Sequence, residues 1–344
     1  MKTFTRYLKY RLENSVLRTL VFTLLSVILT QTVISECIGR MYAEYNETGI
    51  YVLAVVLGVF CTLIPMLELA GFKNRRNLDT LYFFPIKRVK MAAAHYISGF
   101  IQVFIIYSVT FFVAYAHLAL QTNYFALEYM IIYYFLSLLV GLAIYSIFAF
   151  IFLQANSVAD GVLFSVLWMF VLALVLVVVQ NEIIMPILLQ ENEIMVREFV
   201  SSGWGIIYAP INNLTVIFQD LIEVNRGTDW DYLAEQYRKE AYMFFIWGAI
   251  GIAAAVGYFV TFVKKGAHQA GEISESPFGY KMLIPVYGYM LMILLGSEDI
   301  ILTALIFALM IIGYIIYRRG FKFKTGDLVA TGCGILALIV GTMI

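Results

Sequence analysis

The side chains that could do acid–base, nucleophilic or metal chemistry are few and widely scattered. The sequence contains three histidines and three cysteines, namely His95, His117, His268, Cys37, Cys61 and Cys333. No two of them form an H-E-x-x-H zinc motif, and the cysteines are too few and too far apart for a disulfide framework. The sequence also lacks a G-x-S-x-G nucleophile elbow and a G-x-x-x-x-G-K-[ST] phosphate-binding loop. We therefore expect no catalytic residue, metal site or cofactor site on this chain, and each histidine is more simply structural.

Three acidic residues lie in or beside apolar segments, where an ion-coupled transporter would place its coupling groups. Glu68 is close to Lys73 near the end of such a segment, which favours an ion pair over a coupling site. Asp160 precedes Gly161 at the start of another segment, which favours a helix cap, and Glu128 also stands at a segment end. Energy for any transport is therefore expected to come from another chain.

The composition predicts what positions these residues: a bundle of membrane-spanning helices. The 344 residues are 62% hydrophobic and 13% charged, against about 45–50% and 25% in a soluble domain. These values exclude a soluble enzyme, a nucleic-acid binder and a disordered chain. Nine apolar segments suit a bilayer core of about 30 Å, at roughly 17–35, 50–70, 97–119, 127–153, 161–180, 241–263, 282–296, 299–317 and 327–344. The predicted fold class is an all-α polytopic membrane protein.

The distribution of charge predicts the direction of these segments. With the N-terminus in the cytoplasm, 18 of the 23 Lys and Arg residues but 7 of the 23 acids fall on the inner side. The zero net charge therefore divides into +11 inside and −11 outside. Because Lys and Arg remain cytoplasmic, we expect a multi-pass protein of the cell membrane with a cytoplasmic N-terminus.

The residues before the first segment have the pattern of an amphipathic helix at the inner membrane surface. Phe4, Tyr7, Leu8 and Leu12 share one helical face, and Lys2, Arg6, Lys9 and Glu13 share the other. Arg11 interrupts the apolar face unless its head extends to the interface. The alternative is a simple positively charged anchor.

The inner loop over residues 71–100 is basic and aromatic and contains a predicted short helix at 74–84. Leu78, Leu81 and Tyr82 recur at helical spacing on one side. Pro85 should end this helix, because proline lacks an N–H group and restricts Phe84 before it. A loop that only anchors the topology would explain the charge but not the embedded apolar helix.

Residues 76–88 resemble the D-x-L-x-S-L-P-I-x-R cytoplasmic signature of type 2 ATP-binding-cassette (ABC) transporter permeases of Gram-positive bacteria. The matching positions are Asp79, Leu81, Pro85, Ile86 and Arg88. Phe83 and Phe84 stand where the family has Ser and Leu. A weaker similarity follows the sixth segment, where Ala267, Ala270 and Gly271 match small residues and His268 replaces an acid. A plain solvated loop fits that second segment equally well.

The resemblance implies that the loop over residues 71–95 is a coupling helix, which docks into a separate cytoplasmic ATPase. It assigns this coupling to Asn77, Leu78, Asp79, Leu81, Tyr82, Pro85, Ile86 and Arg88. ATP and Mg would be bound by that ATPase and not by this chain. A push on the loop would move the second and third segments against the first and fifth. Since an ATPase pair offers two docking grooves, the resemblance also implies a second permease chain, identical or related.

The outer loop over residues 181–240 is acidic and carries an apolar stretch that is too interrupted to span a membrane. Pro210 splits this stretch, which suggests a re-entrant or interfacial helix. The resemblance implies short outer helices here, and the candidate outer-gate residues are Trp204, Tyr208, Pro210 and Asn213. An ordinary external loop with a core-packing helix is the alternative.

The resemblance implies a six-helix permease core over residues 1–263 and a C-terminal membrane extension over 264–344 of about three spans, to which we assign no role. The expected function is the membrane subunit of an ATP-driven exporter, not itself an enzyme. An amphipathic drug, antimicrobial peptide or lipid would suit its aromatic residues, which include 24 Tyr and 27 Phe. The alternative is a non-transporting membrane sensor or an assembly or immunity protein that uses its acidic outer loop. No feature indicates a nucleic-acid partner.

Overall fold

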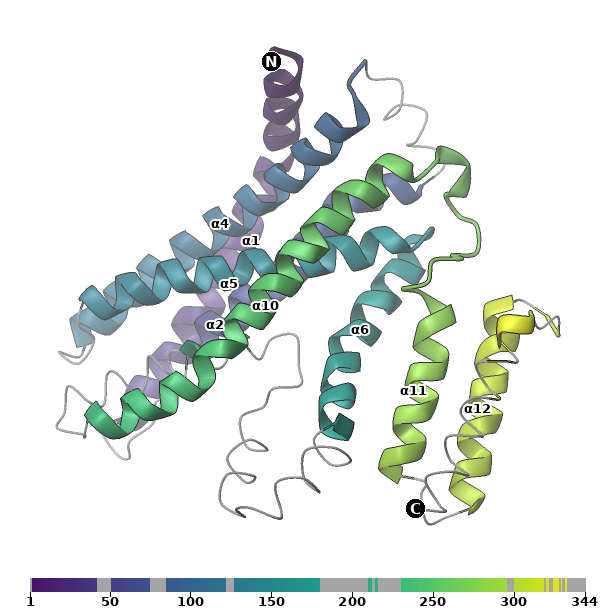
Figure 1. Cartoon of the computed structure of the whole chain (residues 1–344). Coiled ribbons are helices and arrows are strands. Elements are labelled where there is room, and N and C mark those ends of the chain that lie inside the picture. The colour runs from purple at the N-terminus through teal and green to yellow at the C-terminus, as the bar shows by residue number, and fades with distance from the viewer. Residues whose placement is uncertain are drawn as a thin grey trace. The chain divides into compact units, whose positions relative to one another are not determined.

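A computed structural model shows a helical protein, and every regular element in its described part is a helix. The structure describes residues 2–41, 51–74, 85–121, 127–179, 210–211, 214–215, 230–295, 300–318, 320–321, 324–327, 329 and 332. The long helices are α1 (Lys2–Met41), α2 (Tyr51–Ala70), α4 (Arg88–Gln121), α5 (Leu127–Gln154), α6 (Val158–Val179), α10 (Trp230–Lys264), α11 (Tyr280–Leu295) and α12 (Ile300–Arg318) (Figure 1). Two short 3₁₀ helices are η2 (Gly71–Lys73) and η4 (Ala267–Gln269).

Six of the described helices are long and apolar enough to cross a membrane, namely α1, α2, α4, α5, α10 and α12. The predicted all-α polytopic membrane protein is therefore confirmed. α6 covers the fifth predicted segment, and α11, with 16 residues, covers the seventh. The ninth prediction, 327–344, falls almost entirely outside the described residues.

The helix predicted over residues 4–17 forms, but it continues without a break into the first apolar segment. No glycine or proline occurs between Lys2 and Ile38, so nothing interrupts the helix. Its 40 residues extend to about 60 Å, roughly twice the thickness of the hydrocarbon core. The amphipathic pattern matches the burial, because Tyr7 is buried while Arg6 and Lys9 are exposed.

The chain divides into two compact units. The first contains residues 1–153 and 208–267, and the second contains 154–207 and 268–344. The last boundary follows residue 267, and α6 is grouped with the C-terminal helices. The two units are described separately below.

In the first unit, α1 and α4 lie side by side and run in the same direction (Figure 1). Polar side chains join them in order along both helices: Tyr7 with His95, Arg18 with Gln102, Ser26 with Thr110, and Gln31 with His117. The partners are separated by 84 to 88 residues throughout, which is the signature of a parallel pair in constant register. We call this row the α1–α4 polar seam. Such hydrogen bonds between membrane helices each contribute about 0.6–2 kcal/mol.

The other helices of this unit, α2, α5 and α10, run opposite to α1 and α4. α5 is antiparallel to α4: the Tyr107 hydroxyl lies 2.9 Å from Ser137 Oγ, and the Tyr145 hydroxyl donates to the Tyr96 carbonyl at 3.1 Å. α10 also packs closely on α5, since a Cβ added at Gly251 would lie 2.5 Å from the Cβ of Ala143. These directions agree with a chain that crosses a membrane back and forth.

One end of the first unit gathers basic side chains on helix ends. Arg88, the first residue of α4, donates to the carbonyl of Lys265 at 3.2 Å. The Lys265 ammonium donates to the carbonyl of Leu153 at 2.5 Å, and the Lys73 ammonium lies 4.6 Å from the ring centre of Phe152. The ends of α2, α4, α5 and α10 therefore meet here, and we call this the basic end.

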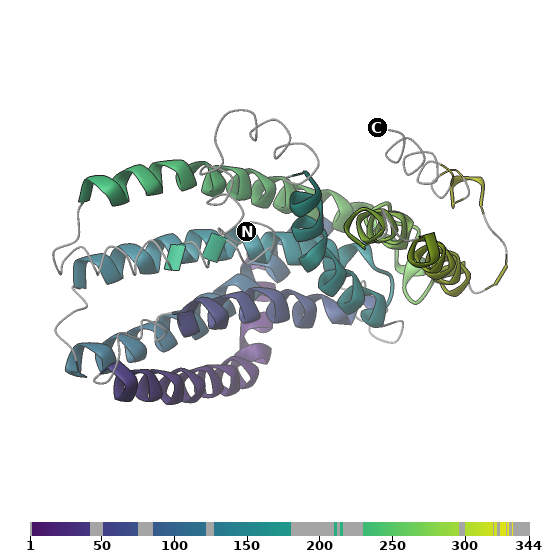
Figure 2. The same ribbon diagram turned by 90° about the horizontal axis from the view of Figure 1, so that it is seen from below.

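The second unit contains α6, α11 and α12, with α11 packed against both of the others (Figure 2). Met292, Ile306 and Met310 form a buried apolar cluster between α11 and α12. At Gly288 the two helices approach closely, because an added Cβ would lie 2.1 Å from the Met310 sulfur. The Trp168 indole N–H on α6 donates to the carbonyl of Phe278 at 2.8 Å.

Candidate functional site

The structure describes three of the eight residues predicted to couple to an ATPase. Pro85 and Ile86 form a bend, and Arg88 begins α4. The short helix predicted over residues 74–84 lies almost entirely outside the described residues and stays a prediction. The remaining predicted residues, Asn77, Leu78, Asp79, Leu81 and Tyr82, lie outside the described residues. Both sides of the segment are nevertheless held at the basic end, by Lys73 over Phe152 before it and by the Arg88 contact after it.

Of the four outer-gate candidates, the structure describes Pro210. It is helical and buried, as is Ile211 beside it. The Thr215 hydroxyl of the same stretch lies 3.0 Å from the hydroxyl of Tyr133 in α5. Trp204, Tyr208 and Asn213 lie outside the described residues, so a re-entrant arrangement stays a prediction.

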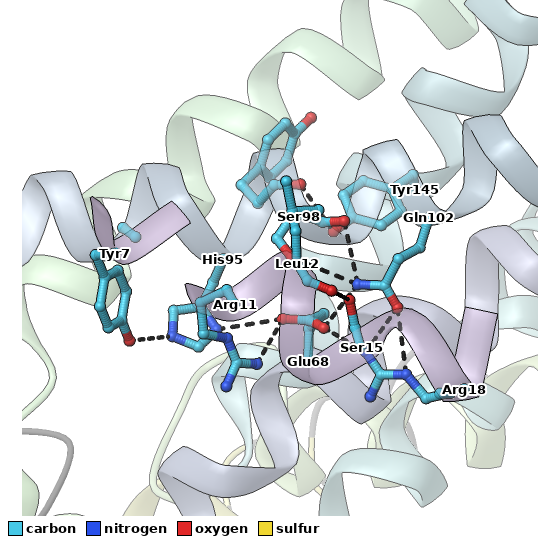
Figure 3. A network of polar contacts seen from close by, with 12 residues as sticks. Tyr7, Arg11, Leu12, Ser15, Arg18, Glu68, His95, Ser98, Gln102 and Tyr145 are labelled. Carbon is cyan, nitrogen blue, oxygen red and sulfur yellow. Dashed lines mark hydrogen bonds and ion pairs between the residues drawn. The ribbon is translucent and has the colours of Figure 1, made fainter. Parts of the chain in front are cut away.

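The densest polar cluster in the described residues surrounds Glu68, in the last turns of α2 (Figure 3). Its side chain is 1% exposed. Arg11 donates to one carboxylate oxygen at 2.7 Å, while Arg18 and Gln102 both donate to the other, Gln102 at 2.9 Å. Gln102 also accepts from the Arg18 Nη2 group at 2.7 Å. One carboxylate on α2 thus joins two guanidinium groups on α1 and an amide on α4.

His95 extends this cluster on its other side. Its Nε2 atom lies 2.9 Å from the Tyr7 hydroxyl, and its Nδ1 atom lies 3.5 Å from a Glu68 carboxylate oxygen. Nδ1 is buried and forms no hydrogen bond within the described residues. Phe72 packs edge-on against the imidazole, with 4.7 Å between ring centres. His95 is thus enclosed by the cluster and an aromatic ring, and a purely structural role for it stays a prediction.

A pocket of about 200 Å³ lies against this cluster and is lined by Arg11, Asn14, Arg18, Glu68 and His95 among others. The arginine side chains are 21% and 27% exposed, whereas that of Glu68 is 1% exposed. The Arg11 Nε–H group is buried and has no hydrogen-bond partner within the described residues. The carboxylate is therefore fully occupied, while donors of the arginines remain available to the pocket.

This arrangement is suited to binding charge. In the described part of the chain no group of three or more His, Cys, Asp or Glu residues could hold a metal ion. The cluster brings one acid and two bases of very high basicity together, and both arginines stay protonated in proteins. The cluster can therefore fix helices to one another and attract an anion.

The ion pair expected at Glu68 is confirmed, but its described partners are Arg11 and Arg18. The sequence nevertheless contains a signal for these partners. Arg11 and Arg18 are seven residues apart, as are His95 and Gln102, which is two helical turns in each case. Two polar stripes of equal spacing, beside a lone acid at the end of an apolar helix, point to such a cluster.

The prediction that Asp160 caps the fifth segment is wrong. The backbone N–H of Asp160 donates to the Ser157 hydroxyl at 3.0 Å, so Ser157 is the cap of α6. The Asp160 carboxylate instead accepts from the Tyr280 hydroxyl at 2.7 Å. The pattern Ser-x-x-Asp before an apolar run is itself the signature of a helix start.

Burial also changes a titration at the basic end. It lowers the pKa of Lys265 from its ordinary value to about 8, because the surrounding protein disfavours the charged ammonium. In a fraction of the molecules the Lys265 amine is therefore neutral at a pH just above the physiological value.

Comparisons of this chain with models of known families, with curated proteins and with solved structures found no significant match. Any assignment of function therefore rests on the residues and geometry described above.

Proposed function

We propose that this chain is the membrane-spanning subunit of an ATP-driven ABC exporter, of the type 2 permease class. A separate cytoplasmic ATPase would bind ATP and Mg, and a second permease chain would complete the complex. The substrate would be amphipathic. The observation that carries the proposal is that the motif-bearing segment is attached on both sides at the basic end of the first unit. By the positive-inside rule this end faces the cytoplasm, where an ATPase could reach it.

The contacts around Glu68 support a way in which force could pass from this segment. The segment connects α2 directly to α4, and Glu68 of α2 accepts from Gln102 of α4. Arg11 and Arg18 of α1 join the same carboxylate, and the α1–α4 polar seam continues along both helices. We therefore propose that α1 moves together with α2 and α4, in place of the expected movement against the first segment. ATP would shift the equilibrium by binding more tightly to one arrangement of the ATPase pair.

Copurification tests the proposal. The full-length tagged chain is purified in mild detergent after coexpression with the genes adjacent to its own, and the copurifying proteins are tested for an ABC ATPase. The Leu81→Asp/Pro85→Gly double variant should reduce ATPase recovery about tenfold. It puts a charge in place of an apolar side chain and a flexible residue in place of proline, at the predicted centre of the interface with the ATPase, where few residues supply most of the binding energy. Membrane insertion should be unchanged.

The matched control is Leu127→Asp, which places the same charge at an exposed site, 53% accessible, at the opposite end of the first unit. It should leave ATPase recovery unchanged. If the complex assembles normally with the double variant, the coupling assignment is wrong. If no ATPase copurifies with the wild-type chain, a non-transporting sensor or assembly protein becomes the better assignment.

A further inference from the structure

We propose that the pocket beside Glu68 binds a phosphate group, and that this phosphate belongs to the headgroup of an anionic membrane lipid. The inference rests on the contacts of α1, α2 and α4 alone. It holds whether or not the chain couples to an ATPase.

The first argument is an imbalance of charge. Two guanidinium groups, Arg11 and Arg18, face a single carboxylate, Glu68. His95, whose Nδ1 atom lies 3.5 Å from the same carboxylate, adds no negative charge to the cluster. The cluster therefore has an excess of one positive charge in a partly buried site, where an unpaired charge is costly. A bound anion would remove this cost.

The second argument is the supply of hydrogen-bond donors. Arg11 uses one Nη2 contact on Glu68, and its side chain, which is 21% exposed, keeps further guanidinium donors beside the pocket. Arginine presents its donors in a planar fork that matches phosphate oxygens two at a time. Asn14, which also lines the pocket, adds an amide on the same helix. The donor set therefore suits a phosphate better than a cation or an apolar ligand.

The third argument is the size and the surroundings of the pocket. Its volume of about 200 Å³ is below the roughly 300–1,000 Å³ of sites for drug-sized ligands, so it suits one headgroup. Leu67, at its rim, is 41% exposed. This apolar side chain can receive an acyl chain, which favours a lipid over free phosphate.

The fourth argument is depth. Arg18 is the last basic residue before the long apolar part of α1, and Glu68 lies in the final turns of α2. Arg18 and Glu68 therefore lie toward the basic end of the first unit. Basic pockets between membrane helices on the cytoplasmic side are a recognised site type for acidic headgroups.

The test uses the purified full chain in neutral detergent, to which mixed micelles are added. The micelles contain phosphatidylglycerol or phosphatidylcholine, and a third arm contains inorganic phosphate alone. Bound lipid is measured by mass spectrometry and the unfolding midpoint by a thermal scan. We expect saturable binding of phosphatidylglycerol with a rise in the midpoint of several degrees, and no such rise in the other two arms.

Four variants sharpen the test. Arg11→Gln should weaken phosphatidylglycerol binding about tenfold, the effect of losing a charge-assisted hydrogen bond. Asn14→Trp should block the pocket without touching the Glu68 contacts. Arg6→Gln removes the same charge from an exposed site on α1 outside the pocket and should change nothing. Glu68→Gln should increase the midpoint shift, because it removes the negative charge that competes with the lipid.

Three results would overturn the binding site, and a fourth would overturn its assignment to a lipid. The first is equal binding of phosphatidylcholine, and the second is an equal loss in Arg6→Gln and Arg11→Gln, which would indicate general attraction by charge. The third is unchanged phosphatidylglycerol binding by Asn14→Trp. Because Asn14 is exposed and does not contact Glu68, this variant fills the pocket without breaking the cluster. A midpoint shift of the same size with inorganic phosphate alone would refute the assignment to a lipid.

Discussion

Replacement of Glu68 by alanine should be among the most destabilising single changes in the first unit. The side chain is 1% exposed and accepts from Arg11, Arg18 and Gln102. Breaking a buried ion pair by removing one partner costs about 3–5 kcal/mol, because the other charge is left without compensation. Since the guanidinium groups are 21% and 27% exposed, water would partly screen them, and the lower value of about 3 kcal/mol applies. The expected fall in the unfolding midpoint is on the order of 10 °C.

Cys61 provides the assay. It is fully buried and its thiol lies 3.2 Å from the Gly141 carbonyl, so a thiol-reactive dye reaches it only on unfolding. A Cys37→Ser/Cys333→Ser background removes the other two thiols of the chain. Dye fluorescence during a thermal scan in detergent then reports the unfolding of the first unit.

Two further variants make the result decisive. Arg11→Gln should cost less, about 1–2 kcal/mol, because Glu68 keeps its contacts with Arg18 and Gln102. Glu13→Ala removes an acid from an exposed pair with Lys9 at 3.7 Å and should shift the midpoint by less than about 1 °C. If Glu68→Ala shifts it no more than Glu13→Ala, or less than Arg11→Gln, the account of the cluster is refuted.

Three other outcomes can be measured with the same scan. The pKa of Lys265 is lowered to about 8 in the folded state, so between about pH 8 and pH 10.5 the unfolded chain binds more protons than the folded chain. The free energy of unfolding of the wild type, relative to that of Lys265→Met, should therefore rise with pH over this range. A difference that does not change with pH would contradict this. Gly99→Ala brings a Cβ to 2.2 Å from the Tyr145 hydroxyl and should cost about 1–3 kcal/mol, whereas Gly248→Ala meets nothing within 4 Å and should be neutral or stabilising. Ser157→Ala should cost about 1 kcal/mol and Ser157→Asp much less; equal losses would remove its role as a cap.

The sequence was sufficient to predict the helical membrane architecture, because apolar length and the positions of Gly and Pro are local properties. It also predicted that Glu68 forms an ion pair. The helix predicted over residues 4–17 exists, but it is continuous with the first apolar segment. Nothing in the local pattern marks the membrane surface along a continuous 40-residue helix.

The partners in the cluster could not be predicted in the same way. Arg11 seemed misplaced on an apolar face because its partner Glu68 is 57 residues away in the chain. The contact arises from the register of three helices, which local periodicity does not specify. Asp160 is a different case: Ser157 was available as a cap three residues earlier, and the acid is instead used by Tyr280, 120 residues further on.

The α1–α4 polar seam also has a consequence for how the chain is made. α1 emerges from the ribosome before α2 and α4, so Arg18 must enter or approach the bilayer before Glu68 and Gln102 exist. A basic side chain without a partner is costly at membrane depth, so nascent α1 should first rest closer to the cytoplasmic surface. The arrival of α2 and α4 would then draw it to its final depth. Assembly of the first unit would in this way act as a late step of translocation, in which a helix already synthesised is repositioned by those that follow.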